Sequence, residues 1–158
     1  MTDSAHLTHV DAAGAARMVD VSAKSVSVRR AVAAGRLHTT AEVVDLLRRD
    51  GLPKGDALAV ARVAGIMGAK RTSSLIPLCH PLALSSVTVD LEVADDAVEV
   101  TATVRTTDRT GVEMEALTAV AVAGLTVVDM VKAVDKRAVI TDIRVLAKSG
   151  GKSGDFRR

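Results

Sequence analysis

The chain has 158 residues, of which 48% are hydrophobic and 1% aromatic, and its formal net charge is +2. This length fits one domain, the charge is too small to indicate DNA binding, and the lack of aromatic rings argues against base stacking on single-stranded nucleic acid. The single cysteine excludes an intrachain disulfide, and the N-terminal residues lack the basic start and apolar run of a secretory signal, so we expect a reducing, cytoplasmic setting.

The first part of the chain predicts an arm, a strand and a helix. Residues 1–17 are polar and small, without a period, and we expect a loose N-terminal arm there. Partial alternation within residues 18–40 predicts a strand. Thr39 has the spacing of an N-cap with Glu42 three residues later, which predicts a helix that ends near Gly51.

The central part predicts a second helix and a hairpin. The apolar spacing of residues 56–70 is that of a helix. Two prolines within residues 71–82 prevent one regular helix there. Residues 84–93 and 97–105 alternate strongly between apolar and polar side chains, with two aspartates between them, and therefore predict two strands joined by a turn.

The last part predicts a long helix over residues 112–134, a strand over 138–147, and a flexible segment over 148–158 that is rich in Gly and Lys and contributes to the site. We therefore expect a single α+β catalytic domain over residues 18–147, with an antiparallel sheet and helices packed on one face. The 13 uncharged residues from 116 to 128 are too few to span a membrane.

Two neighbouring residues between the prolines are candidates for chemistry. Pro77 and Pro81 hold the backbone on either side of His80, which can transfer protons or bind phosphate. The alternative is a structural histidine in a tight connection. Cys79 is expected to line a site rather than react, because side chains of adjacent residues usually point apart.

Acidic residues mark both ends of the long predicted helix. Glu113 and Glu115 are explained either by the helix dipole or by recognition of a guanine-like ring rich in donors. Asp129 and Lys132 share one helix face, either as a surface ion pair or as a partly buried acid–base pair with perturbed pKa values. Both alternatives stay open on the pattern alone.

The two ends of this helix cannot reach one small ligand. Glu115 and Asp129 are 14 residues apart, about 21 Å along the axis. If both serve one site, two subunits must contribute, and a two-fold antiparallel pairing would bring the opposite ends together. The scarcity of large side chains, which limits burial within one chain, also favours an oligomer. Lys54 and Lys148 are candidate phosphate contacts, although Lys148 also fits a solvated tail.

Five segments together resemble a known family: MVDVSAKSVSVRRA, KGDALAVARVAGIMGAK, LIPLCHPL, TDRTGVEMEALTAVAVAGLTVVDMVKAVDK and LAKSGGKSGDF. They are similar to the molybdenum cofactor biosynthesis protein C family, the cyclic pyranopterin monophosphate synthases. The resemblance covers residues 17 to 156. It implies a ferredoxin-like fold and a homohexamer built as three dimers.

The resemblance also implies the reaction and the site. The substrate would be 3′,8-cyclo-7,8-dihydro-GTP, supplied by an upstream radical enzyme, and the products cyclic pyranopterin monophosphate and diphosphate. Asp129 matches an active-site acid or base, and Lys132 a catalytic lysine. The positions that match substrate-binding residues are Lys54, Leu78, Cys79, His80, Glu113, Met114, Glu115 and Lys148.

The expected partners follow from this reading. No protein metal cage is visible, so we expect no resident metal or cofactor, and Mg²⁺ can arrive as a counter-ion of the substrate phosphates. We expect no nucleic-acid or membrane partner. Two other functions stay open: a binding module for small anions or RNA, and a structural subunit of a larger assembly. An RNA-recognition module should carry aromatic side chains on residues 84–93 and 97–105, which have none.

Overall fold

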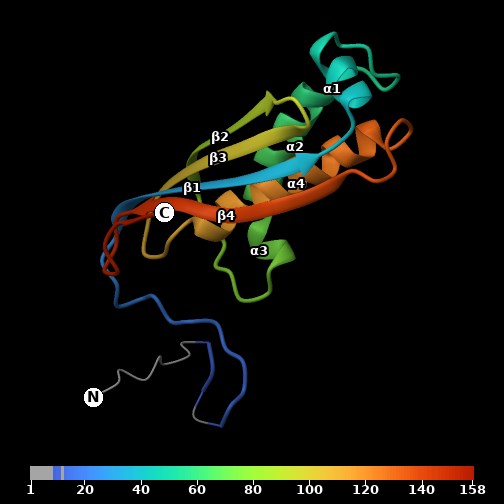
Figure 1. Cartoon of the computed structure of the whole chain (residues 1–158). Helices are drawn as coiled ribbons and strands as arrows, with labels where there is room; N and C mark the ends of the chain where they lie inside the picture. The colour runs from blue at the N-terminus through green and yellow to red at the C-terminus, as the bar shows by residue number, and fades with distance from the viewer. Residues whose placement is uncertain (1–8, 12) are drawn as a thin grey trace.

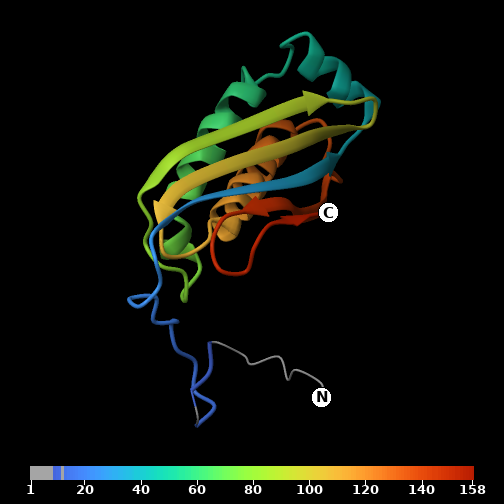
Figure 2. The same ribbon diagram turned by 90° about the vertical axis from the view of Figure 1, so that its left-hand side faces the viewer.

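The computed structural model describes residues 9–11 and 13–158. In chain order the elements are β1 (Ser27–His38), α1 (Ala41–Arg48), α2 (Ala57–Lys70), α3 (Thr72–Leu75), β2 (Leu84–Val93), β3 (Ala97–Asp108), α4 (Glu113–Val131), β4 (Val139–Ser149) and β5 (Phe156–Arg157). The strands form one sheet in the order β2-β3-β1-β4-β5, and all neighbours are antiparallel. Helices α2 and α4 lie side by side on one face of the sheet, and the opposite face is uncovered (Figures 1 and 2).

Alternation of side chains explains why the strands form and which face they bury. In β3, Val98, Val100 and Val104 are at most 2% exposed, whereas Thr101 and Thr103 lie on the uncovered face. The strand expected over residues 84–93 is confirmed as β2 with the same bounds. The α+β class with helices on one face is therefore confirmed.

Helix α4 forms the centre of the core. Its buried residues recur every three or four positions and pack against β1, β3 and β4, while its flank packs against α2. The close contact between the helices depends on Gly65, where an added Cβ would lie 2.9 Å from the carbonyl oxygen of Ala119. By length and composition α4 would also be able to cross a membrane, but this packing against the sheet accounts for its apolar sequence.

The start of α1 differs from the prediction by one residue. Thr40, not Thr39, is the N-cap, and its side-chain oxygen accepts from the Val43 amide. The hydroxyl of Thr39 instead donates to the Asp135 carboxylate at 2.9 Å. The predicted N-cap was wrong because a contact with a distant loop, which local spacing does not reveal, takes the Thr39 side chain.

The N-terminal strand is confirmed, whereas the C-terminal end differs from the prediction. The strand predicted within residues 18–40 is β1, and of the predicted arm, residues 1–8 and 12 lie outside the described residues. The strand predicted to end at residue 147 continues to Ser149, and β5 pairs with it. The segment 148–158 thus has more regular structure than its glycine content predicts, because three glycines with positive φ, Gly150, Gly151 and Gly154, form the connection between the strands.

Candidate active site

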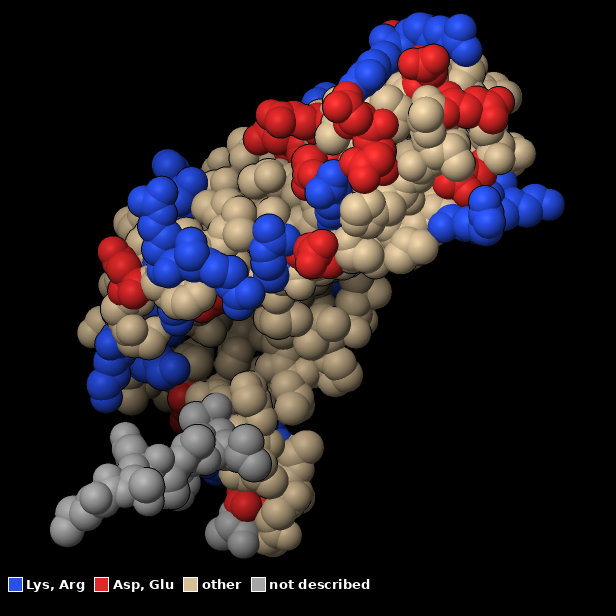
Figure 3. Space-filling model, viewed as in Figure 1, with Lys and Arg blue, Asp and Glu red and all other residues tan. Residues whose placement is uncertain are grey.

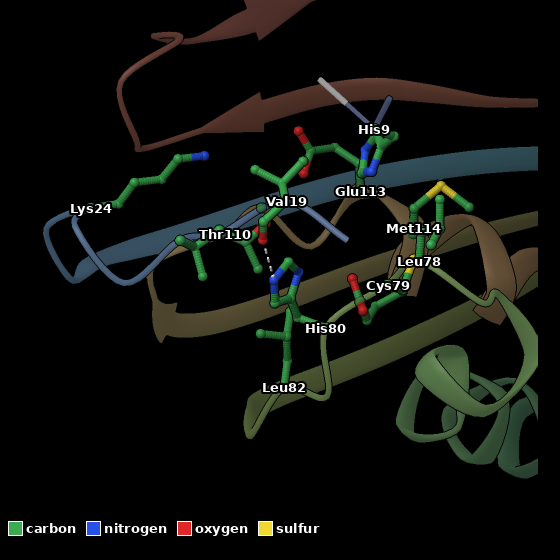
Figure 4. Close-up of a pocket in the computed structure, with 13 residues that line it drawn as sticks. His9, Val19, Lys24, Leu78, Cys79, His80, Leu82, Thr110, Glu113 and Met114 are labelled. Carbon is green, nitrogen blue, oxygen red and sulfur yellow. Dashed lines mark hydrogen bonds between the residues drawn. The ribbon is translucent and has the colours of Figure 1, made fainter. Parts of the chain in front are cut away.

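A cavity of about 390 Å³ opens beside the first turn of α4, and we call it the α4 pocket. Its walls come from the loop after α3, from the start of α4 and from N-terminal residues before β1 (Figure 4). The predicted site residues in its lining are Leu78, Cys79, His80, Glu113, Met114 and Glu115. The structure therefore brings two segments about thirty residues apart in the chain around one cavity.

Glu115 is a buried acid in this pocket, with 4% of its surface exposed. Burial, together with the smaller effect of the nearby Glu113 carboxylate, raises its pKa to about 7. Burial and the charge of Glu115 also raise the pKa of Cys79. At neutral pH Cys79 is therefore a neutral thiol, which agrees with a lining role and not with a nucleophile.

The N-terminal residues reach the pocket through a contact with His80. A ring nitrogen of His80, Nε2, lies 2.8 Å from the backbone oxygen of Val19 (Figure 4). Because a carbonyl oxygen can only accept, Nε2 carries the proton in this contact. The pocket wall therefore includes Val19, Val21 and Lys24, none of which was predicted as a site residue.

A second cavity of about 140 Å³ adjoins the α4 pocket, and we call it the cationic pocket. Its positively charged lining consists of Lys24, Arg29, Arg30 and Lys148. Lys148 Nζ also lies 3.2 Å from Glu113 Oε1. Lys and Arg side chains gather at this end of the molecule, near the C-terminal hairpin (Figure 3). Several cations around a small polar cavity are suited to an anion such as phosphate.

Three cations of this pocket were missed in the sequence analysis. Lys24, Arg29 and Arg30 lie within seven residues, and this basic cluster is the signal that could have found them. Their meeting with Lys148 depends on the pairing of β1 with β4, where Ala31 lies opposite Lys148. Such a long-range pairing is not visible in local spacing.

The remaining predicted residues form a separate cluster at the far end of α4. Asp129 Oδ1 lies 2.7 Å from Lys132 Nζ, and its Oδ2 lies 3.1 Å from Lys54 Nζ. Hydrogen bonds from Lys132 and Lys54 lower the pKa of Asp129, so the carboxylate is ionised at neutral pH. The side chain of Asp129 is 56% exposed within one chain, so the alternative of a partly buried pair is wrong for the isolated subunit.

The site predicted from the sequence is thus divided between the two ends of one helix. The α4 pocket and Lys148 lie at the N-terminal end, and Lys54, Asp129 and Lys132 lie at the C-terminal end. Across residues 9–11 and 13–158, no group of three His, Cys, Asp or Glu side chains could hold a metal ion. The carboxylates and ammonium groups of the two clusters can transfer protons and bind anions.

Residues 18–151 match the model of the MoaC family, which is 134 of the 158 residues. The chain belongs to the MoaC family. A relative from Streptomyces griseus, named cyclic pyranopterin monophosphate synthase, is 74% identical over 96% of this chain and 86% of its own length. A relative of the same name from Nocardioides is 69% identical over 100% of this chain and 99% of its own.

A more distant relative carries the same activity in its name. The protein named cyclic pyranopterin monophosphate synthase 2 from Mycobacterium tuberculosis is 64% identical over 98% of this chain and 93% of its own length. The family expected from the five sequence segments is therefore confirmed. The family model spans residues 18–151, and this range contains the residues named above in both pockets and in the Asp129 cluster.

Proposed function

We propose that this chain is a cyclic pyranopterin monophosphate synthase of molybdenum cofactor biosynthesis. It would convert 3′,8-cyclo-7,8-dihydro-GTP to cyclic pyranopterin monophosphate with release of diphosphate, in the cytoplasm. The observation that carries the proposal is the pair of adjoining pockets at one end of α4 and the carboxylate held between two ammonium groups at the other. Membership of the MoaC family supports the same reaction.

The two adjoining pockets suit the two parts of a nucleotide. The larger one has the carboxylates of Glu113 and Glu115 to accept from the donor edge of a purine-derived ring. The smaller one has the cations for a triphosphate. Lys24 and Thr110 line both, so a single nucleotide can extend from one pocket into the other. Any Mg²⁺ would come with the phosphates.

The cluster at the far end of α4 suits the proton transfers. Because Asp129 is ionised at neutral pH, it acts as the base in the first step that it takes part in. Lys132 and Lys54, which contact its two oxygens, can return a proton and stabilise the negative charge that develops as diphosphate leaves. Closure of the cyclic phosphate forms one P–O bond at the first phosphorus and breaks the bond to the diphosphate.

A complete site then requires a second copy of the chain. The outer surface of the helix layer carries exposed apolar side chains, among them Val63 and Met67 on α2 and Leu125 on α4. Leu125 lies one turn before Asp129 on the same helix face. A copy docked here about a two-fold axis would bring its α4 pocket to Asp129. We propose this dimer as the unit of the homohexamer. With α1 and α3 as additional helices in the first connection and β5 as a short extra strand, the remaining elements follow a β-α-β-β-α-β order, which supports a ferredoxin-like fold.

Mixing two inactive variants tests the shared site. We expect His80→Ala and Asp129→Ala each to lower product formation by about 10²–10⁴ while the chain still folds and assembles. When equal amounts are unfolded together and refolded, about a quarter of all sites receive both intact halves from different chains, so about a quarter of wild-type activity should return. The control is each variant refolded alone. No recovery in an assembled mixture excludes the shared site, and full activity of either variant excludes its assigned role.

A further inference from the structure

The loop of residues 19–24, which contributes to both pockets, is hydrogen-bonded by Arg109, and Arg109 lines neither pocket. Val19, Val21 and Lys24 form part of the α4 pocket wall, and Lys24 also lines the cationic pocket. We propose that Arg109 is a positioning residue that fixes this 19–24 loop, and through it Lys24, for binding of the substrate triphosphate. The nature of the ligand rests on the proposed function, whereas the attachment of the loop does not.

Arg109 makes its contact through the backbone, not through the Lys24 side chain. Its Nε donates to the carbonyl oxygen of Lys24 at 3.0 Å. The connection is reciprocal, because Arg29 Nε donates to the carbonyl oxygen of Asp108 at 3.0 Å and its Nη2 donates to that of Arg109 at 3.1 Å. Two arginines thus tie the residues just before and within β1 to the connection between β3 and α4.

The loop has few other attachments. Its first residue accepts the hydrogen bond from His80, and within it the Lys24 amide donates to Val21 at 3.0 Å in a turn. None of residues 19–24 takes part in the sheet. Such a segment is free to move when its anchors are removed, and its ordering must then be supplied by ligand binding. Lys24 lines both pockets, so looser anchoring would weaken phosphate contacts first.

Loss of the Arg109 contact should weaken substrate binding without an equal decrease in the rate of the chemical step. With Arg109→Ala we expect KM for the substrate and the Kd for inorganic triphosphate to rise about tenfold, as for the loss of one hydrogen bond from a charged donor, with kcat changed less than about twofold. Arg109→Lys keeps a cationic donor for the same carbonyl and should recover most of the affinity. Trypsin cleavage after Lys24 without ligand should be about tenfold faster in Arg109→Ala than in the wild type.

The matched control is Arg48→Ala, which removes another exposed arginine whose Nη2 donates to a backbone carbonyl, that of Ala94, at 3.2 Å. It should change neither triphosphate affinity nor cleavage after Lys24. Unchanged Kd and KM in Arg109→Ala, or a fall in kcat at constant KM, would overturn the positioning role. If the wild-type protein has no synthase activity, the proposed function is contradicted. Faster cleavage and weaker triphosphate binding in Arg109→Ala would still support the role of Arg109 in that case.

Discussion

Burial of Glu115 makes the stability of this chain depend on pH in an unusual direction. The pKa of this acid rises from an ordinary 4.5 to about 7 in the folded chain. Between these values the folded state keeps a proton that the unfolded state has released, so stability falls as pH rises and then becomes constant above about 7. A shift of this size corresponds to roughly 3 kcal/mol at most.

Glu115→Gln removes this titration but keeps the shape of the side chain. Relative to the wild type, the free energy of unfolding of Glu115→Gln should increase by about 1–3 kcal/mol between pH 5 and pH 8. Urea unfolding at a fixed protein concentration and four pH values measures the difference. Glu92→Gln, at an exposed carboxylate on β2, is the control and should show no such change. A constant difference between Glu115→Gln and the wild type across this range would contradict the raised pKa.

At the scale of elements, the contact between α2 and α4 limits which side chains are allowed. Gly65→Ala should gain about 1 kcal/mol in helix propensity. It should nevertheless lower stability by about 1–3 kcal/mol, because the added Cβ meets the rigid Ala119 backbone at 2.9 Å. Gly124→Ala is the matched comparison, since its Cβ meets the end of the Ile140 side chain at 3.2 Å and that chain can move. Thermal unfolding should show Gly65→Ala below, and Gly124→Ala at or above, the wild type.

At the scale of the whole molecule, the exposed apolar surface of the helix layer should decide assembly. Leu125 is 60% exposed in one chain, and a charge there would be buried without a partner in the proposed dimer. We expect Leu125→Arg to be a folded monomer that has lost at least about tenfold of the activity, as measured by light scattering, circular dichroism and turnover. Thr88→Arg on the uncovered face of the sheet is the control. An assembled Leu125→Arg protein, or a fully active monomer, would exclude this interface.

Local pattern predicted most of the strands and helices, α3 and β5 excepted, and the family resemblance supplied the ten predicted site residues. The α2 and β2 segments are confirmed almost to the residue because period and capping depend on neighbours in the chain. The confirmed identity of the family rests on long segments of specific sequence, so it required no coordinates.

Only the tertiary structure decided how these residues are grouped. The separation of Glu115 from Asp129 along the helix was predicted from their spacing, but the structure brings Lys148 to the start of α4 and Lys54 to its end. It also adds Lys24, Arg29 and Arg30 to the phosphate end and leaves Asp129 exposed in a single chain. The meeting of Arg29 and Arg30 with Lys148 depends on the pairing of β1 with β4, between residues more than one hundred positions apart, and the contact of Lys54 with Asp129 spans 75 positions. Spacing along a chain carries no information about such contacts, because the side-chain period of a strand indicates which face a residue occupies and not which strand lies beside it.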